Sequence, residues 1–169
     1  MAQVNLKEFQ ESLARRLRDA AEVEPTTRLG LEAGGQRYLL KLDEAGEVLP
    51  LPRLSPVPLT RDWFLGLANV RGNLVGVVDL GRFSGAAATA QSADARLALF
   101  AERFGARTSL LVARMLGLKK LSLFVRCDRG AAPDWVGECY AEKEGGTTVW
   151  NELDLSRLVT DEKFLQVNR

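Results

Sequence analysis

Apolar and polar positions alternate over much of the chain, and this pattern predicts a protein built mainly of β-strands. Residues 37–42 alternate between apolar and basic side chains, as expected for a strand with one buried face. Residues 65–70 and 74–80 form two more apolar runs. The second contains so few polar residues that we expect it to be buried on both faces. Further strands are expected at 108–112, 121–125 and 135–140.

Helical spacing is found mainly towards the two ends of the sequence. Leu6, Phe9, Leu13 and Leu17 recur at steps of three and four residues, which predicts an amphipathic helix over residues 4–22. Its apolar stripe can pack on the rest of the domain or dock on a partner. A short helix is expected within 154–167. Residues 96–104 fit a helix and a strand equally well, so the pattern leaves that segment open.

Glycine and proline indicate where the strands turn. Gly72-Asn73 supplies a two-residue hairpin turn between 65–70 and 74–80. Gly66 and Gly76 interrupt these strands, which indicates a bulge or a close backbone approach. Four prolines between residues 50 and 58 exclude a helix and a central strand there. Residues 84–94 are small and weakly patterned, and we interpret them as a connection between two halves of one domain.

Composition removes several classes of function. The 169 residues correspond to about one domain, and a net charge of +1 argues against binding a polyanion or an anionic membrane by charge alone. There is no histidine, which removes the commonest general base and imidazole metal ligands. Cys127 and Cys139 provide at most half of a structural zinc site, and we expect them to be buried free thiols. No metal and no cofactor are expected.

No catalytic motif is visible in the sequence. It contains neither a phosphate-binding GxxxxGK[ST] loop nor a GxGxxG turn between a strand and a helix. No apolar run approaches the ~20 residues of a membrane span, and no secretory signal is visible. The residues alone therefore predict a cytoplasmic, mainly β, non-catalytic protein. A barrel that binds nucleic acid remains the alternative, and an enzyme with a site assembled from distant carboxylates comes third.

An ordered set of motifs over residues 47–83 resembles the CheW family of chemotaxis coupling proteins. The set consists of Glu47-Val48, Pro56-Val57-Pro58, the run Gly-Leu-Ala-Asn-Val-Arg-Gly at 66–72, and Val-Val-Asp-Leu at 77–80. Within that family the chain looks most similar to the branch attached to type IV pili and twitching motility. The features of that branch are an added N-terminal helical segment, Val70 in the motif, and a Phe-Leu-Gln-Val tail at 164–167.

The resemblance implies two interlocked five-stranded SH3-like barrels that share an apolar centre. The CheW-like domain would cover 26–169, after an N-terminal helical extension at 1–25 and with a short helix at the C-terminal end. The two barrel subdomains would be connected near 84–94, and 96–104 would be a strand. The implied function is that of an adaptor between a CheA-type histidine kinase, through its regulatory domain, and the hairpin tip of a methyl-accepting chemoreceptor. No reaction would be catalysed.

The resemblance also implies which residues contact these partners. The candidates for receptor or kinase binding are Val48, Gly66, Asn69, Arg71, Gly72, Met115 and Leu118. Arg71 matches the motif arginine, whose role is associated with receptor coupling and local structure. The two glycines and Asn69 shape the backbone, whereas Val48, Met115 and Leu118 line up with strands that flank a receptor groove. Core packing explains these three side chains equally well, and Asp79 is interpreted as structural.

Overall fold

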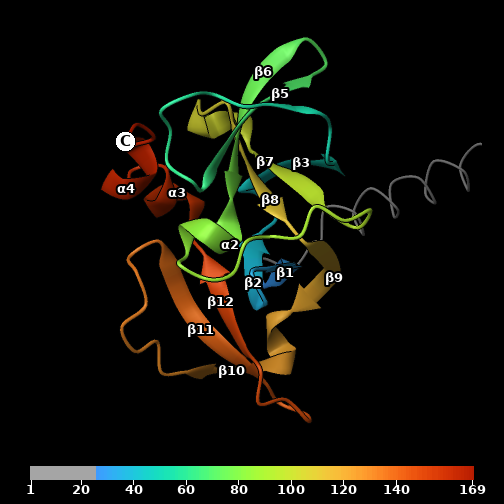
Figure 1. Ribbon diagram of the computed structural model, residues 1–169. Coiled ribbons are helices and arrows are strands. Elements are labelled where there is room, and N and C mark those ends of the chain that lie inside the picture. The colour runs from blue at the N-terminus through green and yellow to red at the C-terminus, as the bar shows by residue number, and fades with distance from the viewer. Residues whose placement is uncertain (1–25) are drawn as a thin grey trace, which may run out of the picture.

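Two six-stranded β-sheets make up most of the protein in a computed structural model that describes residues 26–169 (Figure 1). Sheet A has the order β10 (Phe124–Cys127), β11 (Val136–Glu142), β12 (Val149–Leu153), β2 (Gln36–Lys41), β1 (Thr27–Ala33) and β9 (Arg114–Lys120). Sheet B has the order β3 (Ala45–Pro50), β7 (Arg96–Phe100), β8 (Thr108–Val112), β6 (Asn73–Asp79), β5 (Phe64–Val70) and β4 (Leu54–Ser55). The mainly β fold is as expected, although each sheet has six strands where the resemblance implied five.

Sheet A is built from two separate parts of the sequence, one before and one after the strands of sheet B. Strands β1 and β2 begin sheet A, β3 to β8 build the whole of sheet B, and β9 to β12 complete sheet A. The parallel pairing of β12 with β2 joins the two distant parts of sheet A. The chain therefore crosses between the sheets after β2 and after β8. The segment 84–94, expected to connect two halves, instead connects β6 to β7 within sheet B.

Each sheet curls around an apolar interior of its own. All six strands of sheet B contribute to one cluster, in which Leu49 of β3 and Leu54 of β4 share a core although these strands lie at opposite edges of the sheet. In sheet A, Phe124 of β10 and Leu116 of β9 likewise share a cluster around Trp150. Edge strands that share a core require a strongly curved sheet. Both sheets are therefore barrel-like.

A third and larger apolar cluster lies between the two sheets. It contains side chains from both sheets and from three short helices, α2 (Leu80–Phe83), α3 (Leu155–Leu158) and α4 (Glu162–Leu165). The Phe83 ring lies at its centre, 5.1 Å from the ring of Trp63, 5.6 Å from that of Trp135 and 5.5 Å from that of Phe164. The shared apolar centre implied by the resemblance is therefore present.

Several local expectations need correction. Residues 121–125 are not one strand, because a 3₁₀ turn at Leu121–Leu123 precedes β10. The segment 96–104 is a strand only to Phe100, after which Glu102–Phe104 form a second 3₁₀ turn. The expected C-terminal helix is two helices, each capped by an aspartate that accepts a backbone hydrogen bond in the first turn. The helix expected at 4–22 lies outside the described residues.

Asp79 has the structural role that the sequence suggested. Its carboxylate is 1% exposed and caps α2 by accepting from the backbone N–H groups of Gly81 (3.0 Å) and Arg82 (3.3 Å). The same carboxylate accepts from the N–H of Thr89 at 3.1 Å, which holds the connection to β7 against the sheet. A buried carboxylate with several backbone donors is satisfied without a reaction to perform.

Glu44 is a second buried carboxylate, and it links the turn between β2 and β3 to the start of α3. It is 2% exposed and accepts from the N–H of Leu155 at 3.0 Å. The ammonium of Lys41 and the guanidinium of Arg103 lie 3.8 and 3.9 Å from it. Burial raises the pKa of Glu44 above its ordinary value of 4.5, and these contacts offset only part of the rise.

We expect Glu44 to give stability an unusual pH dependence. Because its pKa is raised on folding, its contribution is fully present below the unfolded value of 4.5 and is lost as pH rises through the folded pKa. The free energy of unfolding of the wild type relative to that of Glu44→Gln should therefore fall as pH increases. Urea titrations between about pH 4 and pH 8 measure this difference. Glu144→Gln, at an exposed site, serves as the control, and an equal slope in both variants would contradict the assignment.

Candidate partner-binding surfaces

The hairpin between β5 and β6 carries three of the residues singled out from the sequence. Its two turn residues are Arg71 (φ 51°) and Gly72 (φ 84°), since Val70 pairs with Asn73 across the strands. The turn thus lies one residue earlier than the expected Gly72-Asn73. The side-chain oxygen of Asn69 accepts from the N–H of Gly72 at 2.8 Å. Positive φ at both turn positions matches the twist of the strands, and Asn69 stabilises the turn from inside the hairpin.

The guanidinium of Arg71 joins the β5–β6 hairpin to β3, which lies at an edge of sheet B. Its two terminal nitrogens donate to the two carboxylate oxygens of Glu47 on β3, at 2.8 and 2.5 Å. The Arg71 side chain remains 75% exposed and that of Glu47 41% exposed. A bidentate pair fixes the direction of the guanidinium, so Arg71 is held at the surface in one orientation. Glu47 was not among the expected site residues. The signal that could have identified it is its carboxylate, which belongs to the same ordered set of motifs as Arg71.

Gly66 has a different role, because it is buried beneath the proline-rich segment rather than exposed at the surface. It is buried with a φ of +126°, at a register shift between β5 and β6. A Cβ at this position would lie 2.2 Å from the carbonyl oxygen of Ser55 and 2.8 Å from the Cα of Pro56. At Gly76 a Cβ would lie 3.1 Å from the ring of Phe64. The bulge or close approach expected at both glycines is therefore present, and Gly66 lets the proline-rich segment pack on β5.

A bulge in β9 brings Met115 and Leu118 onto one face of sheet A. Met115 pairs with Leu31 and Leu118 with Leu29, while the register shifts between these two pairs. Without the shift, residues three apart in a strand would point to opposite faces. Met115 packs against the central cluster, whereas Leu118 is 65% exposed at the edge of the sheet. Met115 is therefore partly a core residue, and Leu118 is a surface residue.

The structure separates the seven candidate residues into two surfaces and one buried position. Asn69, Arg71 and Gly72 lie at the end of the β5–β6 hairpin, and Val48 follows Glu47 on β3 of the same sheet. Val48 is partly exposed and belongs to none of the three core clusters of the described residues. Met115 and Leu118 lie on β9, at an edge of the other sheet, well away from the hairpin end in Figure 1. Gly66 is the buried position.

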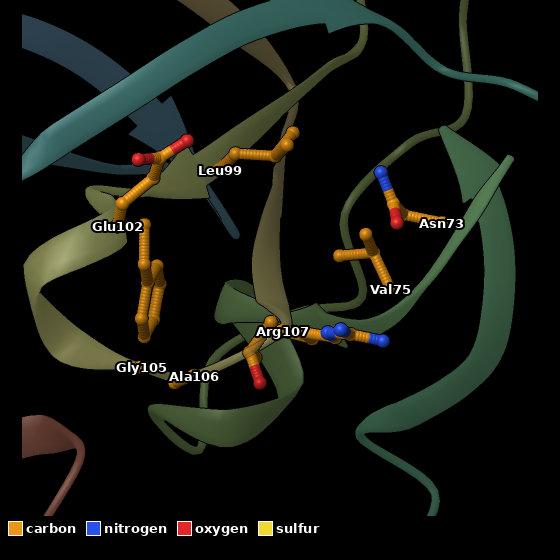
Figure 2. A pocket seen from close by; sticks show the side chains of 9 residues that line it. Asn73, Val75, Leu99, Glu102, Gly105, Ala106 and Arg107 are labelled. Carbon is orange, nitrogen blue, oxygen red and sulfur yellow. The ribbon is translucent and has the colours of Figure 1, made fainter. Parts of the chain in front are cut away.

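A hollow of about 330 Å³ on sheet B was not expected from the sequence. Val75, Leu99 and Phe100 give it apolar walls, and Glu102 and Arg107 lie on different sides of it, as Figure 2 shows. Its volume lies at the lower limit of that of binding sites for small molecules. The two charged groups are exposed, so the hollow does not resemble a water-excluding active site.

Other kinds of site find little support over residues 26–169. In this part of the chain no three His, Cys, Asp or Glu side chains come together in a way that could hold a metal ion. The rings of Trp63, Trp135 and Trp150 are all at most 4% exposed, so none can serve as a stacking platform for a base. No helix of the described residues has the length and apolar character needed to cross a membrane.

We expect Gly66→Ala to be far more destabilising than Gly72→Ala. Both substitutions force alanine to a positive φ, but only at residue 66 does the added Cβ meet backbone atoms, since nothing lies within 4 Å at residue 72. Strain and overpacking together predict a loss of about 3 kcal/mol or more for Gly66→Ala, against about 1 to 2 kcal/mol for Gly72→Ala. Urea unfolding measures both, and equal losses would show that the close approach to Ser55 is not tight.

Comparison with known proteins shows which family has this sequence pattern and this fold. The CheW-like domain matches residues 28–162. Protein PilI of Pseudomonas aeruginosa is 31% identical over 97 residues, which cover 57% of this chain and 54% of PilI. This chain therefore matches only about half of that relative's length. The crystal structure of the scaffolding protein TtCheW from Thermoanaerobacter tengcongensis superposes with a TM-score of 0.63 at 16% identity, covering 76% of this chain and 88% of that one. The fold and the extent of the domain match together lead to one conclusion: the chain belongs to the CheW-like domain family.

Proposed function

We propose that this protein is a non-catalytic adaptor that couples a methyl-accepting chemoreceptor to a CheA-type histidine kinase, in a cytoplasmic pathway that controls type IV pilus twitching motility. The observation that carries the proposal is the CheW-like match over residues 28–162, because members of this family are coupling scaffolds. Similarity to Protein PilI supports the assignment to a pilus pathway.

The chemistry of the chain suits a scaffold better than an enzyme. With no histidine in the sequence, the phosphorylated histidine of such a pathway has to belong to the kinase. The buried carboxylates of Glu44 and Asp79 are already hydrogen-bonded within the fold, so neither is available as a free acid or base. What the surface offers instead is an oriented cation at Arg71 and an exposed apolar side chain at Leu118.

The two surfaces favour different partner chemistry. An arginine held in a bidentate pair presents its remaining N–H groups to a carboxylate or carbonyl of a partner. The face of β9 with Leu118 suits the apolar stripe of an amphipathic helix. We assign the β9 surface to the receptor hairpin and the β5–β6 hairpin to kinase contact. In this assignment Arg71, which matches a motif arginine associated with receptor coupling, acts on coupling through the kinase. A scaffold that binds both partners can transmit a change in the receptor only if it favours one state of the kinase.

Reconstitution of the three components tests the adaptor function. The full chain, a CheA-type kinase and the cytoplasmic fragment of a chemoreceptor from the same organism should form a ternary complex in size-exclusion chromatography. Kinase autophosphorylation should rise several-fold only when all three are present. Absence of binding at low salt, with every component folded, would overturn the proposal. Affinity for single-stranded DNA that falls steeply with salt would favour the nucleic-acid alternative instead.

Leu118→Asp in the same assay tests the β9 surface. Placing a charge at a buried apolar contact should weaken receptor binding at least tenfold while leaving kinase binding unchanged. Leu165→Asp is the matched control, because Leu165 is 64% exposed, as Leu118 is 65% exposed, but lies on α4. Equal receptor affinity of the two variants would remove Leu118 from the receptor surface.

Exchanging the charges at residues 47 and 71 shows whether Arg71 contacts a partner or only stabilises the fold. The exposed pair contributes only about 0.2 to 1 kcal/mol to stability, so Arg71→Glu should remain folded yet lose kinase binding. The double variant Glu47→Arg/Arg71→Glu can form the pair again with reversed charges. If a partner binds the positive charge at residue 71, the double variant stays defective in binding. Recovery of binding would instead make the pair a structural brace.

Arg126→Glu is the matched control for this exchange. Arg126 is also an exposed arginine that pairs across strands, with Glu138 at 3.8 Å, but it lies in sheet A. Its reversal should leave kinase binding unchanged in isothermal titration calorimetry. A loss of affinity as large as that of Arg71→Glu would show that net charge, and not the hairpin, determines binding.

A further inference from the structure

The two cysteines of the chain lie directly opposite each other on neighbouring strands. Cys127 is the last residue of β10 and pairs in register with Cys139 of the antiparallel strand β11. Side chains of directly opposed residues point to the same face of a sheet. Both cysteines accordingly contact the same central cluster, Cys139 as a buried member and Cys127 as a partly buried neighbour. Their spacing of twelve residues in the sequence gave no sign of this contact.

Directly opposed strand positions such as these lie within reach of a disulfide. Opposed Cβ atoms in an antiparallel pair are about 4.5 to 5.5 Å apart, and a disulfide needs about 3.5 to 4.5 Å. The two Cβ atoms have to move only slightly closer together. Strand β10 can allow this movement because it is a four-residue edge strand with a single neighbour. A register shift between Val136 and Cys139 loosens β11 on its other side.

The two thiols have different surroundings and therefore different reactivities. Cys139 is 2% exposed, and burial raises its pKa above the ordinary value, with the nearby Cys127 adding to the rise. Its Sγ–H donates to the side-chain oxygen of Asn151 at 3.2 Å. Cys127 is partly exposed at the point where the chain leaves the strand. An oxidant in solution therefore reaches Cys127 first, and Cys139 is placed behind it as the second thiol.

We propose that Cys127 and Cys139 form a reversible redox site, in which a hydroperoxide converts the two free thiols to a disulfide across β10 and β11. The Cys127 thiolate attacks the peroxide oxygen, the O–O bond breaks, and a sulfenic acid and one hydroxide or alkoxide result. The sulfur of Cys139 then attacks the Cys127 sulfur, the S–O bond breaks, and water leaves with the proton of Cys139. The two sulfurs lose two electrons in total, and the peroxide gains them.

Oxidation would change sheet A at two positions. The new bond would tie the edge strand β10 to β11 and close the connection 128–135 into a ring. Cys139 would lose its hydrogen and with it the donor to Asn151 on β12. One thiol is partly exposed and the other is buried, so the bond can form in two steps that begin at Cys127. This inference does not depend on the proposed adaptor function.

Intact mass spectrometry of the full chain tests the proposal directly. The protein is treated with one equivalent of hydrogen peroxide, quenched with acid and measured without reductant. The wild type should lose the mass of two hydrogen atoms, its two titratable thiols should fall to none, and digestion should yield one peptide pair linked through Cys127 and Cys139. Dithiothreitol should restore both thiols.

Single variants show whether the two thiols act together. Cys139→Ser should instead gain oxygen at Cys127 or form a linked dimer, because no second thiol is in reach. Cys127→Ser should react more slowly than Cys139→Ser, because its remaining thiol is buried. Oxygen addition or dimer formation in the wild type, with no internal link, would overturn the proposal. An internal link that forms only in denaturant would overturn it equally, since the folded register would then not be its cause.

Discussion

The apolar cluster between the two sheets is the interaction on which the rest of the structure depends. Each barrel has a small interior of its own, around Leu97 in sheet B and around Trp150 in sheet A. Neither interior joins the sheets. The Phe83 ring and its neighbours Trp63, Trp135 and Phe164 do so, and they come from segments far apart in the sequence. Because burial of large aromatic side chains dominates core energetics, this cluster holds the two small barrels together.

That arrangement explains why the candidate surfaces lie where they do. The cluster, the capped helices and the carboxylates of Glu44 and Asp79 occupy the space between the sheets. The β5–β6 hairpin and the free edge at β9 remain available on different sheets. The adaptor function proposed above requires two separate surfaces that are held in a fixed relation to each other. The interlocked path of the chain, in which strands from both sides of sheet B in the sequence complete sheet A, ties the two sheets together.

Much of the fold could be predicted from the sequence, and the failures have physical causes. The strand expected at 74–80, which is buried from Val75 onward, and the strand at 37–42 follow directly from their patterns. Alternation alone missed β9, because its bulge breaks the pattern that identifies a strand, and only the resemblance placed Met115 and Leu118 on one. The turn was placed one residue too late because Gly72-Asn73 is a good turn sequence by itself. In the folded protein the amide of Asn69 and the pair with Glu47 hold Arg71 at a positive φ instead.

The sequence by itself determined the class of this protein: the motif series over 47–83, the strand-rich pattern, and the absence of histidine and of catalytic motifs. It also predicted that Gly66, although a candidate contact residue, shapes the backbone and that Asp79 is structural, because their residue types allow conformations and contacts that few others do. Only the tertiary structure decided which side chains meet. Arg71 contacts Glu47 across a curled sheet, Met115 and Leu118 share a face through a bulge, and Cys127 faces Cys139 in register. Such contacts depend on sheet curvature and strand register, which are set by the packing of distant segments and leave no local pattern in the chain.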